Sequence, residues 1–424
     1  MEAVANKKEV SLIPKLRFKE FEGEWNNLLL GELFTFKNGL NSDKDKYGSG
    51  VKFINVLDII NETPITYDSI IGSVEVSEKE FKKNEVGYGD VLFQRSSETR
   101  EEVGQANIYI DKNQSAVFGG FVIRGKGKLD YDPLFMNYLL KTSPARKEIT
   151  TKSGGSTRYN VGQDSLSSVL IKTTTLPEQQ KIASFLTAVD EKIQQLTRKK
   201  SLLAQYKKGV MQKLFAQEIR FKDYNGNNYP DWEEIGIGKH IELISGIAIK
   251  GPEMVDEKIG TPILRGINIT EGFVRHSVEI DKYFIGSIDK LDKYVLKTGD
   301  LVLGMDGSKV GKNCAIISKR DEGSILIQRV ARIRTKETAS LEYIYQHIFS
   351  SRFHKYVDVV NTSSGIPHIS AKQINEFMIP FPCLEEQQKI ATYLSSLDQK
   401  IETVNHQITH TQTFKKGLLQ GMFV

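Results

Sequence analysis

EQQKIA at residues 178–183 recurs letter for letter at residues 386–391, an offset of 208 residues (386 − 178). The match continues along the chain at the same offset. It includes Leu186, Asp190, Lys192, Ile193, Lys207, Lys208, Gly209, Gln212 and Phe215, which return at 394, 398, 400, 401, 415, 416, 417, 420 and 423. A repeat of this length indicates two similar structural units in one chain.

Both copies of the repeat are predicted to be long helices, because apolar residues recur at the spacing of a heptad seam. The first seam contains Ile182, Leu186, Val189, Ile193 and Leu196. After a stutter at Lys200 we expect it to continue at Leu203, Tyr206, Val210 and Leu214. The second seam contains Ile390, Leu394, Leu397, Ile401, Val404 and Ile408, followed by Phe414 and Leu418.

The two helices, each about 57 Å long at ~1.5 Å per residue, are expected to pack on each other as a coiled coil. The alternative is that each helix covers the surface of its own domain. Matching heptads in both copies favour the coiled coil.

The segments that precede the helices match each other more weakly. Arg17-Phe18 and Arg220-Phe221 open the two halves, and the run Gly89–Phe93 corresponds to Gly299–Leu303. Short β-branched and aromatic runs between turn residues indicate strands, whereas residues 133–149 and 341–357 have helical spacing. We therefore expect an α+β fold with two pseudo-symmetric domains. The expected boundaries are domains at 1–175 and 217–383, with long helices at 176–216 and 384–424.

Length and composition are those of a globular protein with more than one domain. The chain has 424 residues, a formal charge of +5 and only two cysteines, Cys314 and Cys383. The N-terminal residues lack the apolar stretch of a secretory signal, and no apolar run is long enough for a membrane span. We expect a cytoplasmic protein without membrane association and without a disulfide framework.

Sequence motifs of catalysis are nearly absent. Residues 307–313 imitate a phosphate-binding loop, but the spacing is too short and no Ser or Thr follows the lysine. Asp132-Pro133 is only a fragment of the motif of an amino-methyltransferase. We therefore expect no catalytic residue, cofactor site or metal site in this chain.

Four polar loops occupy matching places in the two halves, two after the Gly-Asp strands and two before the long helices. Their residue types are those that reach DNA phosphates and base edges. In the first half the candidate DNA-binding residues are Arg95, Ser96, Ser97, Thr99, Arg100, Lys152, Ser156, Thr157, Arg158 and Tyr159. In the second half they are Ser308, Lys309, Lys312, Ser363, Ser364 and His368. The alternative is that these are ordinary solvated loops; their repetition favours a binding role.

The repeated Leu-x-Glu-Gln-Gln-Lys-Ile-Ala context at 176–183 and 384–391 resembles the conserved regions of type I restriction–modification specificity subunits. Leu16-Arg17-Phe18 before Trp25 and the Gly89–Phe93 run resemble the same family. The resemblance extends from about residue 14 to the C-terminus.

This resemblance implies two target recognition domains, each of which reads one half of a bipartite site in double-stranded DNA. It implies antiparallel long helices that set the half-site spacing and dock two modification subunits, which methylate adenine N6 with S-adenosylmethionine. It also implies that restriction subunits join this complex. ATP and Mg, like S-adenosylmethionine, are expected on the partner subunits and not on this chain. Partner or coiled-coil contacts are expected at the seam residues and at Gln179, Gln180, Gln387 and Gln388.

Two other interpretations of the chain remain open at this point. A self-contained DNA-modifying enzyme would methylate DNA as the purified chain alone. A structural coiled-coil adaptor would bind DNA weakly and without sequence preference.

Overall fold

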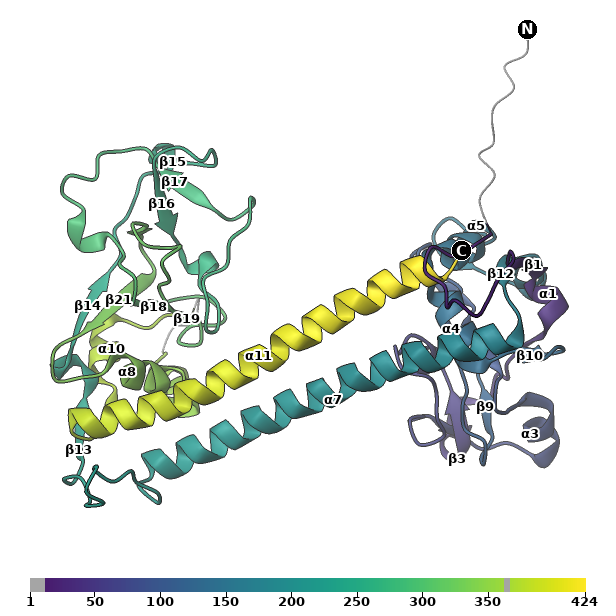
Figure 1. Cartoon of the computed structure of the whole chain (residues 1–424), viewed down its shortest axis with the longest axis horizontal. Helices are drawn as coiled ribbons and strands as arrows, with labels where there is room; N and C mark the ends of the chain where they lie inside the picture. The colour runs from purple at the N-terminus through teal and green to yellow at the C-terminus, as the bar shows by residue number, and fades with distance from the viewer. Residues whose placement is uncertain (1–11, 362–366) are drawn as a thin grey trace, which may run out of the picture. The chain divides into compact units, whose positions relative to one another are not determined.

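The computed structural model describes residues 12–361 and 367–424, so Ser363 and Ser364 lie outside the described residues. The chain divides into two compact units. Unit 1 comprises Met1–Arg198 and Asn405–Val424, and unit 2 comprises Lys199–Val404. The long helices α7 (Leu176–Phe215) and α11 (Leu384–Met422) therefore each contribute to both units (Figure 1).

Unit 1 contains two four-stranded sheets. The first, in the order β2-β10-β6-β8, is antiparallel and consists of β2 (Phe34–Asn38), β10 (Val122–Gly127), β6 (Val91–Gln94) and β8 (Ala106–Ile108). The second, in the order β4-β3-β9-β5, contains β4 (Ser73–Val74), β3 (Tyr47–Ile54), β9 (Ala116–Phe118) and β5 (Glu85–Val86). Its strands β3 and β9 are parallel. Two short antiparallel pairs join β1 (Asn26–Leu29) to β12 (Leu170–Thr173) and β7 (Ser96–Ser97) to β11 (Tyr159–Asn160).

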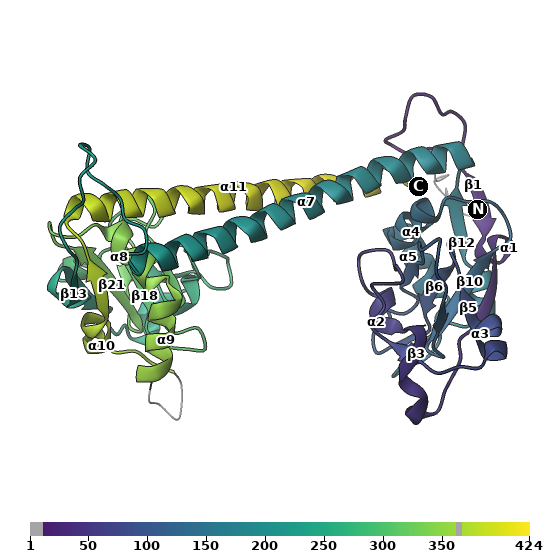
Figure 2. The same ribbon diagram turned by 90° about the horizontal axis from the view of Figure 1, so that it is seen from below.

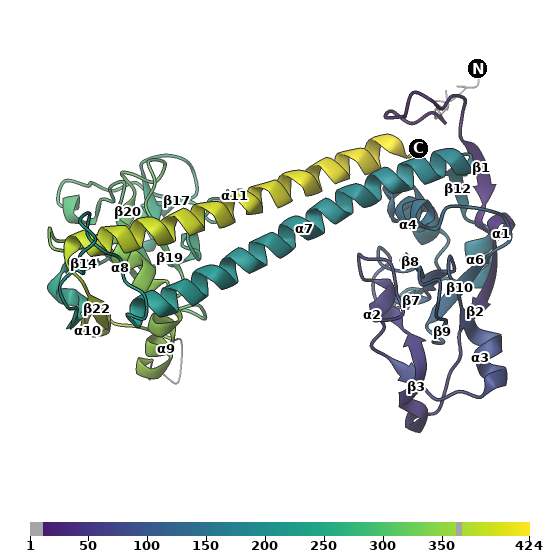
Figure 3. The same ribbon diagram turned by 60° about the horizontal axis from the view of Figure 1, so that its bottom comes forward.

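The helices of unit 1 complete its core. They are α1 (Leu30–Leu33), η1 (Lys44–Lys46), α2 (Val56–Ile59), α3 (Glu78–Asn84), α4 (Pro133–Lys141), α5 (Ser143–Thr151) and α6 (Gln163–Ser167). Helix α4 lies beside the start of α7 (Figure 3). One apolar cluster contains Trp25, Phe135 of α4, Ile182 of α7 and Phe423, so the end of the chain packs into the core of unit 1.

Unit 2 repeats the strand order of the first sheet, whereas its second sheet has the parallel strand pair at one edge and not in the middle. Its first sheet, in the order β14-β21-β18-β19, contains β14 (Ile241–Ser245), β21 (Val330–Thr335), β18 (Leu301–Gly304) and β19 (Cys314–Ile316). Its second, in the order β15-β17-β16-β20, contains β15 (Met254–Val255), β17 (Lys282–Phe284), β16 (Thr261–Leu264) and β20 (Ile325–Leu326), and β16 and β20 are parallel. The pair β13 (Glu233–Gly236) and β22 (Met378–Phe381) corresponds to β1 and β12.

Unit 2 also contains short helices, of which α8, α9 and α10 are seen near β18 and β21 in Figure 2. They are η2 (Ile237–Lys239), η3 (Gly251–Glu253), η4 (Gly266–Asn268), η5 (Asp292–Tyr294), α8 (Leu341–Ile348), α9 (Ser351–Val360) and α10 (Ala371–Glu376). The core joins Tyr343 of α8 to Leu214 of α7 and to Ile390 and Leu394 of α11. The α+β fold and the two long helices expected from the sequence are confirmed, as are the helices expected near 133–149 and 341–357.

The two long helices run in opposite directions. In unit 1 the beginning of α7 shares a core with the end of α11, and in unit 2 the end of α7 shares a core with the beginning of α11. Seam residues such as Ile182, Leu186 and Ile390 are buried as expected. The coiled coil itself stays a prediction, because what the structure describes is helix packing within each unit.

Two seam residues are not buried as expected. Tyr206 is 53% exposed, although its hydroxyl lies 2.8 Å from that of Tyr393 on α11, and Phe414 is 50% exposed. The following lysines, Lys207 and Lys415, turn toward the opposite helix. Each lysine binds an aspartate there, so a charged residue occupies the position that the heptad pattern assigns to an apolar one. The aromatic rings are left on the surface.

No helix in the described ranges is apolar over a length that could cross a membrane.

Gly39 and Gly246 occupy equivalent close approaches in the two units. A β-carbon on Gly39 would lie 2.2 Å from the carbonyl oxygen of Gly119, and one on Gly246 would lie 2.1 Å from that of Ile327. Both distances are far below van der Waals contact, so only glycine fits directly after β2 in unit 1 and directly after β14 in unit 2. The repeated glycine is a backbone requirement and is not a ligand site.

Alanine at Gly39 or Gly246 should therefore destabilise its unit by about 1–3 kcal/mol, the usual cost of overpacking. Gly209→Ala is the matched control, because Gly209 lies within α7 and a β-carbon there meets no atom within 4 Å. The control should stabilise the helix by up to about 1 kcal/mol. Urea unfolding of the three variants measures these changes, and a Gly39→Ala protein as stable as Gly209→Ala would contradict the close approach.

Candidate functional site

The glutamate of each EQQKIA motif anchors its long helix to the start of its own domain. The carboxylate of Glu178 accepts two hydrogen bonds of 2.8 Å from the guanidinium of Arg17. Glu386 accepts bonds of 3.2 and 2.8 Å from Arg220, and one of 2.7 Å from the Trp232 ring nitrogen. Both glutamates are at most 1% exposed. Bidentate pairing of this kind fixes orientation as well as position.

The pKa of the Glu178 carboxyl is lowered. Burial acts to raise it, and the hydrogen bonds from Arg17 and Thr174 outweigh that effect. The carboxylate is thus the stable form at neutral pH.

The first glutamine of each motif holds the start of another helix. The side-chain oxygen of Gln179 accepts a 3.0 Å hydrogen bond from the backbone N–H of Asp132, which caps α4. That of Gln387 accepts a 3.0 Å bond from the N–H of Ser340, which caps α8. Both glutamines are buried, so they act within their own domains. This differs from the partner contact that we expected for them from the sequence. The second glutamines, Gln180 and Gln388, are exposed.

A repeated lysine–aspartate pair joins the two long helices in each unit. Lys415 Nζ lies 2.6 Å from Asp190 Oδ1 in unit 1, and Lys207 Nζ lies 2.6 Å from Asp398 Oδ1 in unit 2. Each aspartate also accepts a hydrogen bond from the short helix of its domain: Asp190 from Tyr138 at 2.7 Å, and Asp398 from Gln346 at 3.0 Å. The pair therefore ties both long helices to the adjacent domain.

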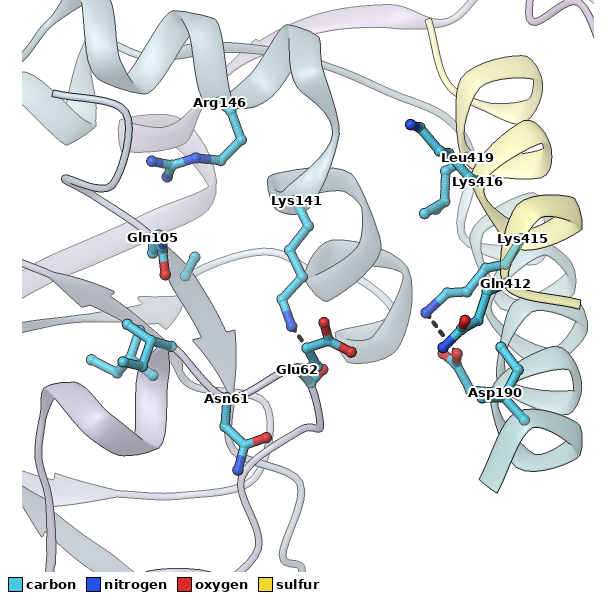
Figure 4. A pocket seen from close by; sticks show the side chains of 14 residues that line it. Asn61, Glu62, Gln105, Lys141, Arg146, Asp190, Gln412, Lys415, Lys416 and Leu419 are labelled. Carbon is cyan, nitrogen blue, oxygen red and sulfur yellow. Dashed lines mark hydrogen bonds and ion pairs between the residues drawn. The ribbon is translucent and has the colours of Figure 1, made fainter. Parts of the chain in front are cut away.

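A cavity of about 520 Å³ lies beside this pair in unit 1 (Figure 4). Its wall carries four cationic side chains and two carboxylates: Lys141, Arg146, Lys415, Lys416, Glu62 and Asp190. The Lys141 ammonium donates a 3.0 Å hydrogen bond to the Glu62 carbonyl oxygen. Burial, with a contribution from the nearby Lys415, lowers the pKa of Lys141 to about 8.

The corresponding cavity of unit 2, about 750 Å³, keeps the charged Lys207, Lys208 and Asp398 in its lining and adds the apolar Met211, Phe215 and Phe349. Phe349 stands where unit 1 has Lys141, at the repeat offset of 208 (349 − 141). Equivalent places next to the helix pair thus differ in polarity.

The two polar loops of the first domain lie next to each other. Strand β7 pairs with β11, with Ser97 opposite Tyr159 and Ser96 opposite Asn160. Beyond this pair, reciprocal backbone hydrogen bonds of 3.0 and 2.8 Å between Gly154 and Asn160 close a tight loop. Gly155 has a φ of 120°, and a β-carbon there would meet the Arg158 carbonyl oxygen, so the loop requires glycine.

Unit 2 brings its two loops together in the same way. Asp306 and His368 form an antiparallel bridge, and Gly307 N–H donates to the Pro367 carbonyl at 3.0 Å. This contact between segments distant in the chain was not expected from the sequence. It places the four predicted loops at two equivalent sites, one per domain.

Most predicted DNA-binding residues of the first domain are solvent-exposed. These include Arg95, Thr99, Arg100, Lys152, Ser156, Thr157 and Arg158, while Ser96 and Tyr159 are half-buried. Ser97 is buried, and its hydroxyl donates to Glu102 at 2.9 Å, so it stabilises the loop from within. In the second domain Ser308, Lys309, Lys312 and His368 are exposed.

The backbone under each loop pair is the same in both units. Arg95 N–H donates to the Phe121 carbonyl and Val161 N–H to the Arg95 carbonyl, both at 2.9 Å. Met305 N–H donates to the Arg329 carbonyl at 2.9 Å, and Ile369 N–H to the Met305 carbonyl at 2.8 Å. We call this backbone the loop frame: residues 94–95, 121–122 and 161 in unit 1, and 304–305, 329–330 and 369 in unit 2.

An open hollow of about 410 Å³ lies at the loop frame of unit 1. Its polar lining is Asn38, Arg95, Asn160, Gln163 and Asp164. Asn38, Gln163 and the neighbouring Phe121 were not among the residues predicted from the sequence. The signal that could have located Asn38 is its place directly before Gly39, which matches Gly246 in the second half.

No three His, Cys, Asp or Glu side chains within 12–361 and 367–424 are grouped so that they could hold a metal ion. The candidate site consists of polar and cationic loops on a hydrogen-bonded backbone frame, and it is present once in each unit.

Comparison with known proteins identifies the family. The model of the type I restriction modification DNA specificity domain matches residues 22–205 and again 230–411, well over half of the chain. The chain belongs to this family of type I restriction–modification specificity subunits, whose role is recognition of DNA sequence.

Curated relatives agree with this family. The MjaVIII specificity subunit of Methanocaldococcus jannaschii is 28% identical over 299 residues, which covers 68% of each chain. The EcoKI specificity subunit of Escherichia coli is 27% identical over 354 residues, 78% of this chain and 73% of the relative.

Solved structures share the fold. The type I S subunit from M. genitalium superimposes with a TM-score of 0.60 at 16% identity, covering 97% of this chain and 99% of that one. A chain from a structure of type I system assembly gives a TM-score of 0.55 at 17% identity, covering 94% and 96%.

Glu178→Gln should lower the free energy of unfolding by about 1.5–3 kcal/mol at pH 7, because it removes the charge that pairs with Arg17. The folded pKa of Glu178 is lowered, so its contribution is present above the unfolded value of about 4.3 and is lost as pH falls through the folded pKa. The difference between wild type and variant should therefore shrink below about pH 4. Urea unfolding between pH 3 and 7 measures it, with the exposed Glu24→Gln as control; a constant difference would contradict the pairing.

Lys415→Met should raise the pKa of Lys141 above about 8, because it removes a neighbouring positive charge and leaves Asp190 unpaired. The titration of ¹³C-methylated lysines by NMR follows this shift. The control is Lys126→Met, at a lysine outside this cavity. An unchanged or lower pKa of Lys141 in Lys415→Met would contradict the geometry of the cavity.

Proposed function

We propose that each of the two domains reads one half of a bipartite site in double-stranded DNA. The chain would thereby direct adenine-N6 methylation, and restriction, by partner subunits that carry S-adenosylmethionine, ATP and Mg²⁺. The chain itself would supply no catalytic group.

The observation that carries this proposal is the loop frame, which is built twice from the same hydrogen bonds while the side chains on it differ. A protein that reads two identical half-sites would need the same side chains in both places. One backbone with two sets of side chains suits an asymmetric site.

The charges of the loops support contact with DNA. Arg100, Lys152 and Arg158 surround the first loop pair, and Lys309 and Lys312 belong to the second. Exposed cations next to small residues and backbone N–H groups are the usual means of holding phosphates. Base edges would then be read by side chains nearer the loop frame.

The modification subunits are proposed to dock on outward faces of α7 and α11. Gln180 and Gln388 are exposed at equivalent places near the starts of these helices. Phe185 of α7 and its equivalent Tyr393 of α11 lie five residues further on, and Phe185 is 36% exposed. Surfaces repeated within one chain suit two copies of the same partner.

The test is to express the chain with its modification subunit in a host without adenine methylation and to map methylated adenines by long-read sequencing. The proposal predicts one bipartite motif with two unlike halves, and no methylation by the purified chain alone. A genome without modified adenines would contradict the proposal, and methylation by the chain alone would favour a self-contained enzyme.

Inserting one heptad in each long helix should lengthen the spacer between the two half-sites. The insertions follow Arg198 in α7 and Val404 in α11, where the two units divide. Seven helical residues add about 10 Å, or about three base pairs. The mapped motif should keep both half-sites and gain about three unspecified positions. A spacer of unchanged length in a methylating variant would show that these helices do not set the spacing.

A further inference from the structure

The loop frames of the two domains can be compared position by position, because the same strand registers and hydrogen bonds define both. Gln94 lies opposite Val122 in the register of β6 and β10, and Gly304 lies opposite Val330 in that of β18 and β21. The residue that directly follows the strand, called here the strand position, is Arg95 after β6 in unit 1 and Met305 after β18 in unit 2. The internal repeat thus provides an alignment of two recognition surfaces within one chain.

The buried residues of the frame keep their apolar character. Val122 corresponds to Val330 and Val161 to Ile369, and all four are at most 1% exposed. The frame is therefore held by the same kind of packing in both domains, so differences above it are not compensations for a different core.

Residues on top of the frame change chemical class. Asn38 corresponds to Ser245, as the residue before the close-approach glycine. The exposed amide of Asn160 corresponds to the exposed imidazole of His368. At the turn, Phe121 is 64% exposed, and its counterpart Arg329 has a side chain that is 63% exposed.

The cation also changes place between the two frames. In unit 1 the strand position carries the exposed Arg95 and the turn carries an aromatic ring. In unit 2 the strand position carries Met305, 5% exposed, and the turn carries Arg329. The Arg329 guanidinium lies 3.2 Å from the carboxylate of Asp306, and its backbone has a φ of 72°. A non-glycine residue held at positive φ is uncommon, and such residues cluster at functional sites.

The mixture of charges in the hollow of unit 1 favours base edges over phosphates. Phosphate sites gather donors and cations, whereas this hollow combines the Arg95 guanidinium, the amides of Asn38 and Asn160, and the carboxylate of Asp164. Arginine pairs with guanine O6 and N7, asparagine with adenine N6 and N7, and a carboxylate accepts from cytosine N4. One Arg95 N–H donates a 3.3 Å hydrogen bond to the Gly120 carbonyl oxygen, and the other guanidinium N–H groups remain available to a base.

We propose that the side chains on the loop frame are the base-reading groups of the two domains: Arg95, Asn38 and Asn160 with Phe121 in the first, and Arg329 with His368 in the second. This inference rests on the proposed DNA-recognition function. Arg95 and Arg329 each specify a guanine, one in each half-site, and the Asn160 amide specifies an adenine.

The experiment uses the complex of the chain with its modification subunit, and long-read mapping of methylated adenines. Arg95→Met and Asn160→His place in the first domain residues that the same frame carries in the second. Arg329→Gly removes the guanidinium at a φ that glycine adopts without strain. The control is Arg320→Gly, at an exposed arginine outside the frame.

Arg95→Met and Asn160→His should each relax one base of the first half-site and leave the second unchanged. Arg329→Gly should do the reverse. The preference for the specified base should fall on the order of 10- to 100-fold. The unaltered half-site serves as an internal check on folding, and Arg320→Gly should keep the wild-type motif.

Variants that methylate the complete wild-type motif with unchanged preference would overturn the inference and leave the proposed function standing. Complete loss of methylation in Arg95→Met and Asn160→His, with an unchanged midpoint of thermal unfolding, would also count against single-base reading. A wild-type complex that methylates no genomic site would overturn the proposed function and this inference together.

Discussion

The fold depends on an ion pair that is made twice, between a partly exposed arginine at the start of each domain and the buried glutamate of the EQQKIA motif. Arg17 with Glu178, and Arg220 with Glu386, connect the two ends of a domain at the point where the long helix begins. The neighbouring glutamine then fixes the first turn of α4 or α8. Because these bonds are directional and buried, each domain is held to its helix in one orientation.

This constraint explains why the EQQKIA motif is identical in the two halves of the chain while the loops differ. Motif residues are committed to internal bonds, as are the lysine–aspartate pairs such as Lys415 with Asp190. The loops stand on a frame that uses only backbone hydrogen bonds, so their side chains can change without loss of the fold. A chain built in this way can acquire a new recognition surface in one domain while its helices and its other domain remain as they are.

Much of this architecture could be predicted from the sequence, because the long helices and main strands have strong periodic patterns. The bounds of α7 and α11 agree closely with the repeat. The exposure of Tyr206 and Phe414 could not be predicted, because a hydrophobic pattern does not show that the next residue, Lys207 or Lys415, pairs with an aspartate on the opposite helix. The contact between the two loops of each domain could not be predicted, since it joins segments far apart in sequence through short strands with no periodic signal.

We propose that each domain reads DNA independently on a common scaffold. An antiparallel strand pair joins the two ends of each domain. Asn26 pairs with Thr173 in unit 1, and Glu233 pairs with Phe381 in unit 2, which gives matched points for exchange. The most direct measurement maps the adenines methylated by a complex whose chain carries residues 26–173 in place of 233–381. The expected target is a symmetric site built from two copies of the first half-site. A site that still contains the second half-site would contradict the claim.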